Sequence, residues 1–278
     1  MALPPPRSWS DTYTFVSAAA SSGDAALCGY ARECVLNEIE RVGAAKAFPL
    51  EEAHNVMLCR ATSKGHSAIC LKALQWGATS LNEMLWRAAS TGNRSLCVLA
   101  REHGAVDFGA MLEGAVYGAH YELCLLAGEW GADPDGVTLN VYLRSVGEAS
   151  RDETEAKRRE VRMICGLLLQ WGASEVDLLL ESAAECGDRD LCCLARERGA
   201  TDFEAMLKGA AASGNRELCL LAREWGANPP GGALDALMRK AMHGGDSAMC
   251  ACRVAGRDTS AAGTGGPGHR SSPAFRLQ

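Results

Sequence analysis

The sequence predicts an all-α solenoid, in which about eight similar helix–turn–helix units are stacked with little or no β structure. Three features that return at fixed intervals predict it: a Gly-Ala pair, a cysteine, and a leucine followed by an alanine. The Gly-Ala pair ends at residues 78, 105, 132, 173, 200 and 227, at intervals of 27, 27, 41, 27 and 27 residues. A period of about 20 to 50 residues is typical of solenoids, because one such unit cannot bury its own apolar face.

The copy from Thr201 to Ala227 indicates how one unit folds. Asp202 can accept hydrogen bonds from free backbone amides, and it is expected to begin a helix that extends to about residue 212. The residues Ser213-Gly214-Asn215 interrupt that helix, and a second one is expected from 216 to 225. Its apolar residues recur at the spacing of one helix face. They are Leu218, Leu221, Ala222 and Trp225.

Two positions predict how neighbouring units pack. The leucine position, twelve residues before the repeated cysteine, holds Val16, Leu58, Leu85, Leu112, Leu180, Leu207 and Met238. The alanine position, nine residues before the cysteine, holds Ala19, Ala61, Ala88, Ala115, Ala183, Ala210 and Ala241. Large side chains at one position and small ones at the other favour close stacking. A glycine five residues before the cysteine is expected in the turn between the two helices.

The array is expected to span residues 13–255, between a disordered lead-in at 1–12 and a disordered tail at 256–278. Its units are expected to end near residues 44, 78, 105, 132, 173, 200, 227 and 255. The fifth unit is 14 residues longer than the others. With Leu139 in the leucine position, the extra residues are expected as a helical extension at about 147–160 that projects into solvent. The alternative is a basic docking surface for an acidic partner, made of Lys157, Arg158, Arg159 and Arg162.

The order Gly-x-x-Glu-Leu-Cys-x-Leu-Ala-x-x-x-Gly-Ala resembles the second helix and following turn of the ankyrin repeat, and Leu-x-x-Ala-Ala resembles its first helix. The resemblance covers about residues 17–253. The unit has 27 residues rather than about 33, and Asp107-Phe108 and Asp202-Phe203 stand in place of Thr-Pro-Leu-His. The resemblance therefore implies an array with its β-hairpins shortened to loops. Compact arrays of this kind resemble those of large DNA viruses and some protists.

Composition favours a soluble protein of the cell interior, in the host cytoplasm if the chain is viral. The net charge is −6 and the pI about 5.6, whereas a nucleic-acid-binding face must be basic. No stretch approaches the length of a membrane span, and no signal peptide is recognised. The thirteen cysteines are predicted to be free and mostly buried, because stacked helices lie about 10 Å apart, beyond the reach of a disulfide bond.

No pattern indicates catalysis, a metal site or a cofactor. None of the six histidines stands in His-Glu-x-x-His or at ligand spacing from cysteines. Function is therefore expected on the array's surface. In ankyrin-like arrays the first helices line the concave groove, which implies that variable residues there face a partner. They are Trp86, Arg87, Glu113, Tyr117, Glu181, Lys208 and Arg239.

Tryptophan, tyrosine and arginine are enriched at binding hot spots, but ordinary surface variation would produce the same pattern. A second set, Trp76, Trp130, Trp171 and Trp225, is predicted to pack each helix against the next turn; the alternative is an exposed aromatic ladder. The sequence predicts a monomeric, non-enzymatic adaptor that binds an intracellular protein. The alternatives are a nucleic-acid-binding α-solenoid and an enzyme that uses one of the cysteines.

Overall fold

The computed structural model describes residues 9–43, 48–149 and 154–228. These residues form fourteen α-helices and no strand, which confirms the all-α class for this part of the chain. The first helices of the pairs are α1 (Trp9–Ser22), α3 (Leu50–Ser63), α5 (Leu81–Ser90), α7 (Phe108–Tyr117), α9 (Gly136–Ala149), α11 (Val176–Cys186) and α13 (Phe203–Ala212). The second helices are α2 (Ala25–Val42), α4 (Ser67–Gln75), α6 (Arg94–Glu102), α8 (Tyr121–Trp130), α10 (Glu155–Gln170), α12 (Arg189–Glu197) and α14 (Arg216–Trp225).

At the N-terminal end the helical array starts earlier than predicted, and at the C-terminal end the predicted last unit lies outside the described residues. Helix α1 begins at Trp9, before the expected residue 13, and carries Asp11 in its first turn, where a carboxylate stabilises the positive end of the helix dipole. The expected eighth unit and the tail at 256–278 lie outside the described residues, as do residues 1–8.

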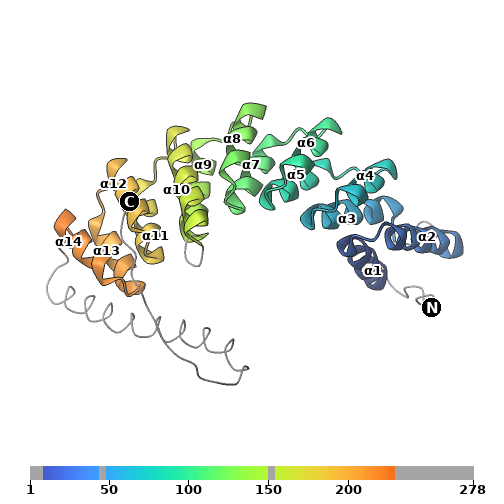
Figure 1. The fold of residues 1–278 in the computed structure, drawn as a ribbon, viewed down its shortest axis with the longest axis horizontal. Helices are drawn as coiled ribbons and strands as arrows, with labels where there is room; N and C mark the ends of the chain where they lie inside the picture. The colour runs from blue at the N-terminus through green and yellow to red at the C-terminus, as the bar shows by residue number, and fades with distance from the viewer. Residues whose placement is uncertain (1–8, 44–47, 150–153, 229–278) are drawn as a thin grey trace, which may run out of the picture.

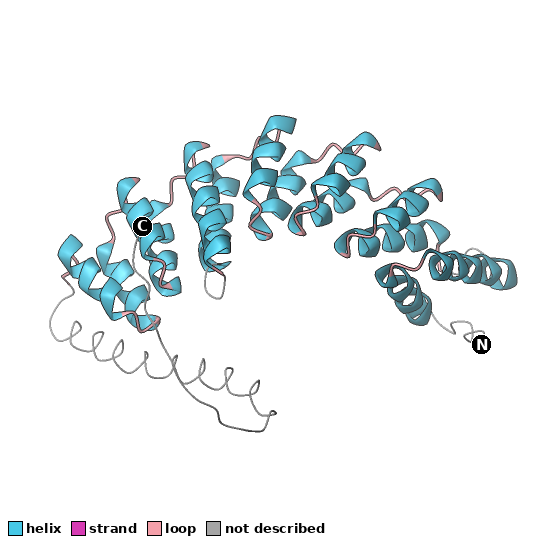
Figure 2. Ribbon diagram, in the orientation of Figure 1, coloured by secondary structure: helices cyan, strands magenta, loops and turns pink. Residues whose placement is uncertain are grey.

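The helix pairs follow one another along an arc, with the first helices toward its inner side and the second helices toward its outer side (Figure 1). Turns and short loops join consecutive helices wherever the connecting residues are described (Figure 2). The first helices of neighbouring pairs pack on each other, most extensively α5 on α7 and α11 on α13, whereas second helices of neighbouring pairs touch less. Between the fourth and fifth pairs the first helices α7 and α9 touch no more than the second helices α8 and α10 do. This unequal packing bends the stack.

The predicted packing positions form the core. At the leucine position Val16, Leu58, Leu85, Leu112, Leu180 and Leu207 are fully buried, and so are the alanines that follow them three residues later. The repeated cysteines are fully buried as well: Cys28, Cys70, Cys97, Cys124, Cys165, Cys192 and Cys219. One apolar layer therefore continues through the described stack, and every pair contributes the same positions to it.

Glycine allows the closest approach between first helices. A Cβ atom at Gly114 of α7 would lie 2.3 Å from the carbonyl oxygen of Trp86 in α5. At the equivalent place in the next block, a Cβ atom at Gly209 would lie 2.8 Å from the carbonyl oxygen of Glu181. Real Cβ atoms do not approach a backbone oxygen so closely, so any larger residue would push the two helices apart.

The described turns inside the pairs depend on a left-handed residue followed by a polar one. Gly92 has φ 73°, and the equivalent Ala119 adopts the same region at φ 51°. The next residue is often an N-cap: Asn93 accepts a hydrogen bond from the backbone amide of Leu96 at 3.1 Å. In the second pair His66 stands there instead, and its Nε2 lies 3.2 Å from the carbonyl oxygen of Ser21 in the preceding pair.

In four of the described first helices, α3, α5, α9 and α11, a polar side chain also joins the helix to the loop that precedes the next pair. The oxygen of Asn55 accepts hydrogen bonds from the amides of Thr79 (2.7 Å) and Ser80 (3.0 Å). Asn82 and Asp177 accept equivalent pairs of hydrogen bonds from the loops that follow, at 2.6–3.2 Å. These bonds hold a loop that has no β-hairpin to satisfy its amides.

The fifth pair follows a different register from the one predicted. There Asn140 makes the equivalent bonds, to the amides of Ser174 (2.8 Å) and Glu175 (3.2 Å). Counting from Asn140 places Leu143 in the leucine position and Val146 in the alanine position, both 1% exposed. The expectation that Leu139 holds the leucine position is therefore wrong by one helical turn. Leu139 corresponds instead to Phe108 and Phe203, which begin the first helices of two other pairs. Part of the extra sequence therefore lies before Leu143.

The rest of the extra sequence lengthens α9 and α10, and α10 does not project into solvent as expected. Lys157 of α10 donates hydrogen bonds to the carbonyl oxygens of Gly118 and Ala119, just after the C-terminus of α7. Glu160 accepts one at 3.4 Å from the amide of Tyr121, at the N-terminus of α8. A cation at a helix C-terminus and a carboxylate at an N-terminus both stabilise the helix dipole, so the extension packs on the fourth pair.

Replacement of Gly114 by alanine should lower the free energy of unfolding by about 1 to 3 kcal/mol, because the new methyl group meets the α5 backbone. Chemical denaturation followed by circular dichroism measures it. Gly166→Ala is the control: it lies within α10, nothing lies within 4 Å of its added Cβ, and it should gain about 0.5 to 1 kcal/mol of helix propensity. Equal effects of the two substitutions would contradict the close packing of first helices.

Candidate protein-binding face

The predicted binding residues fall on the first helices, on the inner side of the arc. Trp86 and Arg87 belong to α5, and Glu113 and Tyr117 belong to α7. We call the exposed surface of the first helices the inner face. Glu181 and Lys208 lie on α11 and α13, beyond α9, and among the described residues no contact joins them to the α5–α7 group. Arg239 lies outside the described residues.

The structure brings Trp86 and Tyr117 together. Their ring centroids are 5.9 Å apart and the ring planes are tilted by 35°. Trp86 is partly buried, whereas Tyr117 is 74% exposed, which is far more than a tyrosine held by the core would be. Aromatic rings 4.5 to about 7 Å apart attract each other, so the pair presents a fixed aromatic surface to solvent.

A depression of about 460 Å³ lies between α5 and α7 beside this pair. Its lining residues are Asn82, Glu83, Trp86, Arg87, Asp107, Ala110 and Glu113. Arg87 is not free to anchor a partner, because its Nη2 lies 2.7 Å from Glu83 and its Nη1 donates to the hydroxyl of Ser63 at 3.3 Å. The exposed carboxylate of Glu113 has no ion pair within the described part of the chain.

The second set of tryptophans packs between pairs and does not form an exposed ladder. Arg101 lies 4.5 Å from the ring centroid of Trp130, and Arg196 lies 4.5 Å from that of Trp225. Trp130 and Trp225 also contact the phenylalanines that begin their own pairs, Phe108 and Phe203, at centroid distances of 5.7 and 5.8 Å. Trp76 lies 6.0 Å from the ring of His54 instead. The sequence contains a signal for this packing that was not recognised: an arginine stands four residues after the cysteine of the unit that precedes the tryptophan.

Three of the four basic residues proposed as an alternative docking surface make contacts within the fold, and of these Arg158 lies 3.9 Å from Glu155. Lys157 contacts the fourth pair, as described above. Arg162 lies 2.6 Å from Glu155, 3.3 Å from Asp188 and 2.9 Å from Asp190. Asp188 caps α12, and its side chain is only 2% exposed. The arginine therefore compensates a buried charge, and this segment joins α10 to the sixth pair.

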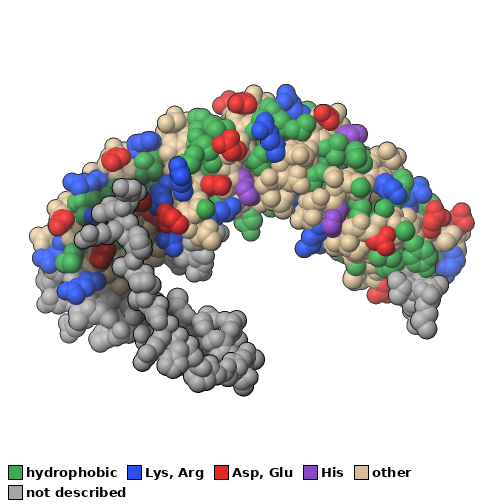
Figure 3. Space-filling model, in the orientation of Figure 1, with side chains coloured by type: hydrophobic (Ala, Val, Ile, Leu, Met, Phe, Trp, Pro, Cys, Tyr) green, Lys and Arg blue, Asp and Glu red, His purple; other side chains and the backbone are tan. Residues whose placement is uncertain are grey.

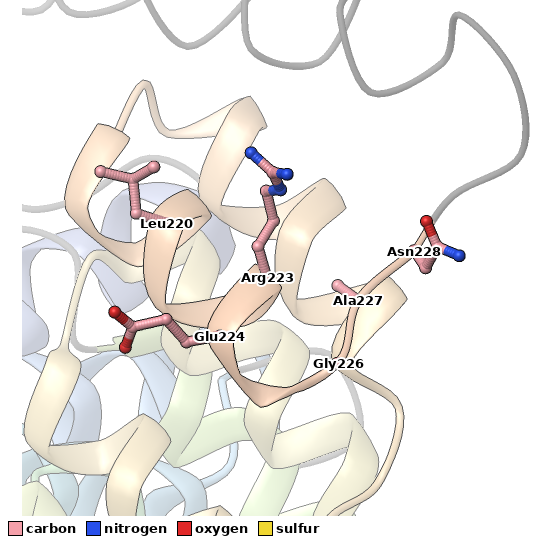
Figure 4. Close-up of a pocket in the computed structure, with 6 residues that line it drawn as sticks. All are labelled: Leu220, Arg223, Glu224, Gly226, Ala227 and Asn228. Atoms are coloured by element: carbon pink, nitrogen blue, oxygen red, sulfur yellow. The ribbon is translucent and has the colours of Figure 1, made fainter.

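A further depression of about 570 Å³ lies at the end of α14, where the side chains of Arg223 and Glu224 point in different directions (Figure 4). Its described lining contains no aromatic side chain. On the face in view the described residues mix basic and acidic side chains, without a broad area of one charge (Figure 3). Neither feature competes with the α5–α7 group as a binding site.

The cysteines of the core are poor nucleophiles. Burial raises the pKa of Cys97, Cys124, Cys165 and Cys192 to about 12. The thiolate is the reactive form, so these side chains stay protonated and unreactive at neutral pH. Among the described residues no group of three or more His, Cys, Asp or Glu side chains could hold a metal ion.

No family model matches the sequence, and no curated protein matches it significantly. None of the described helices is long and apolar enough to cross a membrane.

Replacement of Arg162 by alanine should destabilise the fold by about 2 to 4 kcal/mol, because it leaves the carboxylate of Asp188 buried without a cation. Chemical denaturation measures the change. The control is Arg159→Ala, which removes an exposed arginine of the same helix and should change stability by less than about 0.5 kcal/mol. A similar small effect of both substitutions would contradict a structural role for Arg162.

Native-state thiol labelling should separate Cys192 from its neighbour Cys193. Cys192 is fully buried and its thiolate form is negligible from pH 7 to 9, so iodoacetamide should modify it at least about a hundredfold more slowly than the partly exposed Cys193. Peptide mass spectrometry gives both rates, and the difference should vanish in denaturant. Faster labelling of Cys192 in the native protein would identify it as an activated thiol instead.

Proposed function

We propose that this protein is a non-enzymatic adaptor that binds an intracellular partner protein through the inner face of an ankyrin-like array. The single observation that carries the proposal is the exposed Trp86–Tyr117 pair beside the α5–α7 depression. Aromatic side chains at the centre of an exposed surface are the commonest binding hot spots. A tyrosine that is three-quarters exposed buries little apolar surface, so a binding role explains its place beside Trp86 better than stability does.

The ankyrin-like assignment is part of this proposal. It is supported by the helix–turn–helix pair, by the closing Gly-Ala turn and by the first helices on the inner side of the arc. The shortened loop explains the 27-residue period, since Asn or Asp side chains satisfy the loop amides that a longer hairpin would pair. The eighth unit and an origin in a large DNA virus or a protist belong to the same proposal.

The two alternatives have less support. A nucleic-acid-binding solenoid needs a basic inner face, but Glu83, Asp107 and Glu113 line the depression and its one arginine is paired with Glu83. A cysteine-dependent enzyme needs an exposed thiol of low pKa, whereas burial raises the pKa of four of the repeated cysteines to about 12. No described contact favours either one.

The test is partner capture from cell lysate by matched variants. W86A/Y117A should lose at least about tenfold of the bound partner, because hot-spot aromatics contribute about 2 kcal/mol or more each. The control is the triple variant L71A/V98A/L220A, which removes exposed apolar side chains from the second helices on the outer side. Both variants should keep the wild-type circular dichroism spectrum.

Loss of the partner by the outer variant, with retention by W86A/Y117A, would reject the inner face as the binding surface. The single variants E181K and K208E define how far the surface extends. A partner that spans the arc should be weakened by them, whereas a partner confined to the α5–α7 group should not.

A further inference from the structure

The chain contains two copies of one block, and this offers an internal comparison. The segment from Leu99 to Ala115 is nearly repeated from Leu194 to Ala210. The two copies fold alike: Asp107 and Asp202 cap α7 and α13, each accepting a hydrogen bond at 2.9 Å from the amide three residues on. The glycines that let first helices approach also correspond. The α5–α8 and α11–α14 segments are therefore two versions of one scaffold.

The two versions differ on the inner face. Where the first has Trp86, the second has Glu181; where the first has Glu113, the second has Lys208. Tyr117 corresponds to Ala212, so the aromatic pair is absent from the second version. Because the second version has the same helices and caps without these side chains, the fold does not require them. The aromatic pair is an addition to the scaffold that stability does not explain.

The charges around the pair are mostly negative. Three carboxylates and one guanidinium line the depression, and the guanidinium of Arg87 is already paired with Glu83. The carboxylates of Asp107 and Glu113 remain without an ion pair in the described residues. The same negative charges act on Tyr142 of α9. Burial raises the pKa of Tyr142 to about 12, and the carboxylates of Glu113, Asp107 and Asp135 add to the rise.

We propose that Trp86, Tyr117 and Glu113 together bind a positively charged side chain, lysine or arginine, of an extended basic segment in the partner. The ring faces of tryptophan and tyrosine attract cations, and a carboxylate beside them strengthens the attraction. Asp107 would repel an anionic segment from the same depression. This inference rests on the proposed function and specifies the partner chemistry for its central contact. The other copy, with Glu181, Lys208 and Ala212, lacks the aromatic pair and should not bind a cation in this way.

The experiment measures binding of fluorescein-labelled peptides by fluorescence anisotropy. One pool carries lysine and arginine between glycine, serine and alanine; a matched pool carries aspartate and glutamate instead. Peptides of about 12 residues span about 40 Å when extended, enough to cross several helix pairs. The full chain should bind the basic pool and not the acidic one, and the affinity should fall with added salt.

Three variants locate the site. W86A/Y117A keeps the net charge and should weaken binding of the basic pool about tenfold, and E113Q should weaken it about fivefold. E102Q, in the second helix α6 on the outer side, removes the same charge from an exposed position and should leave binding unchanged. The exchange variant W86E/E113K/Y117A carries the residues of the second copy; it should fold normally and lose binding to the basic pool.

Several results would overturn the inference. Equal weakening by E113Q and E102Q would mean that only the overall charge attracts basic peptides. Failure of the basic pool to bind, or equal binding of both pools, would reject the cation site. Neither result touches the proposed function, which fails only if the captured partner does not depend on the inner face at all. A partner lost by W86A/Y117A while the basic pool does not bind would keep the function and discard this chemistry.

Discussion

The close packing of first helices is the constraint on which the rest of the structure depends. Alanine, glycine and a buried leucine at fixed positions let neighbouring first helices approach until backbone meets backbone, as Gly114 does with the carbonyl of Trp86. The second helices are held farther apart, with tryptophan and arginine side chains stacked between them. The difference in spacing curves the stack and places the first helices on its inner side, where their outward side chains form one continuous surface.

Most of the fold could be predicted from the sequence, because the core positions recur with their chemistry unchanged. The fifth pair could not, since Leu139 and Leu143 are one helical turn apart, both apolar and both buried. Only the hydrogen bonds of Asn140 distinguish the two registers. The packing of α10 was missed for a related reason. A mixed run of charges looks solvated in a sequence, while the partners of Lys157 and Arg162 stand some 26 to 39 residues away.

The candidate site was predictable in part. The residues that vary at first-helix positions were recognised, but their grouping was not, because grouping depends on distances across helices. Trp86 and Tyr117 meet, whereas Glu181 and Lys208 lie in another block. Arg87 had every property of an anchor in the sequence, yet its guanidinium is held by Glu83 and Ser63. Side-chain pairing of this kind has no periodic signal.

The lengthened α10 has a consequence for how the array responds to force and heat. In a simple solenoid each pair contacts only its neighbours, so the ends can unravel one pair at a time. Here α9 packs on α7 far less than α5 does, so the contacts of Lys157 with the fourth pair and of Arg162 with the sixth supply attachment that the first helices do not. The middle of the arc therefore depends on charged side chains more than the stacks on either side of it, and force or heat should separate the array there as well as at its ends.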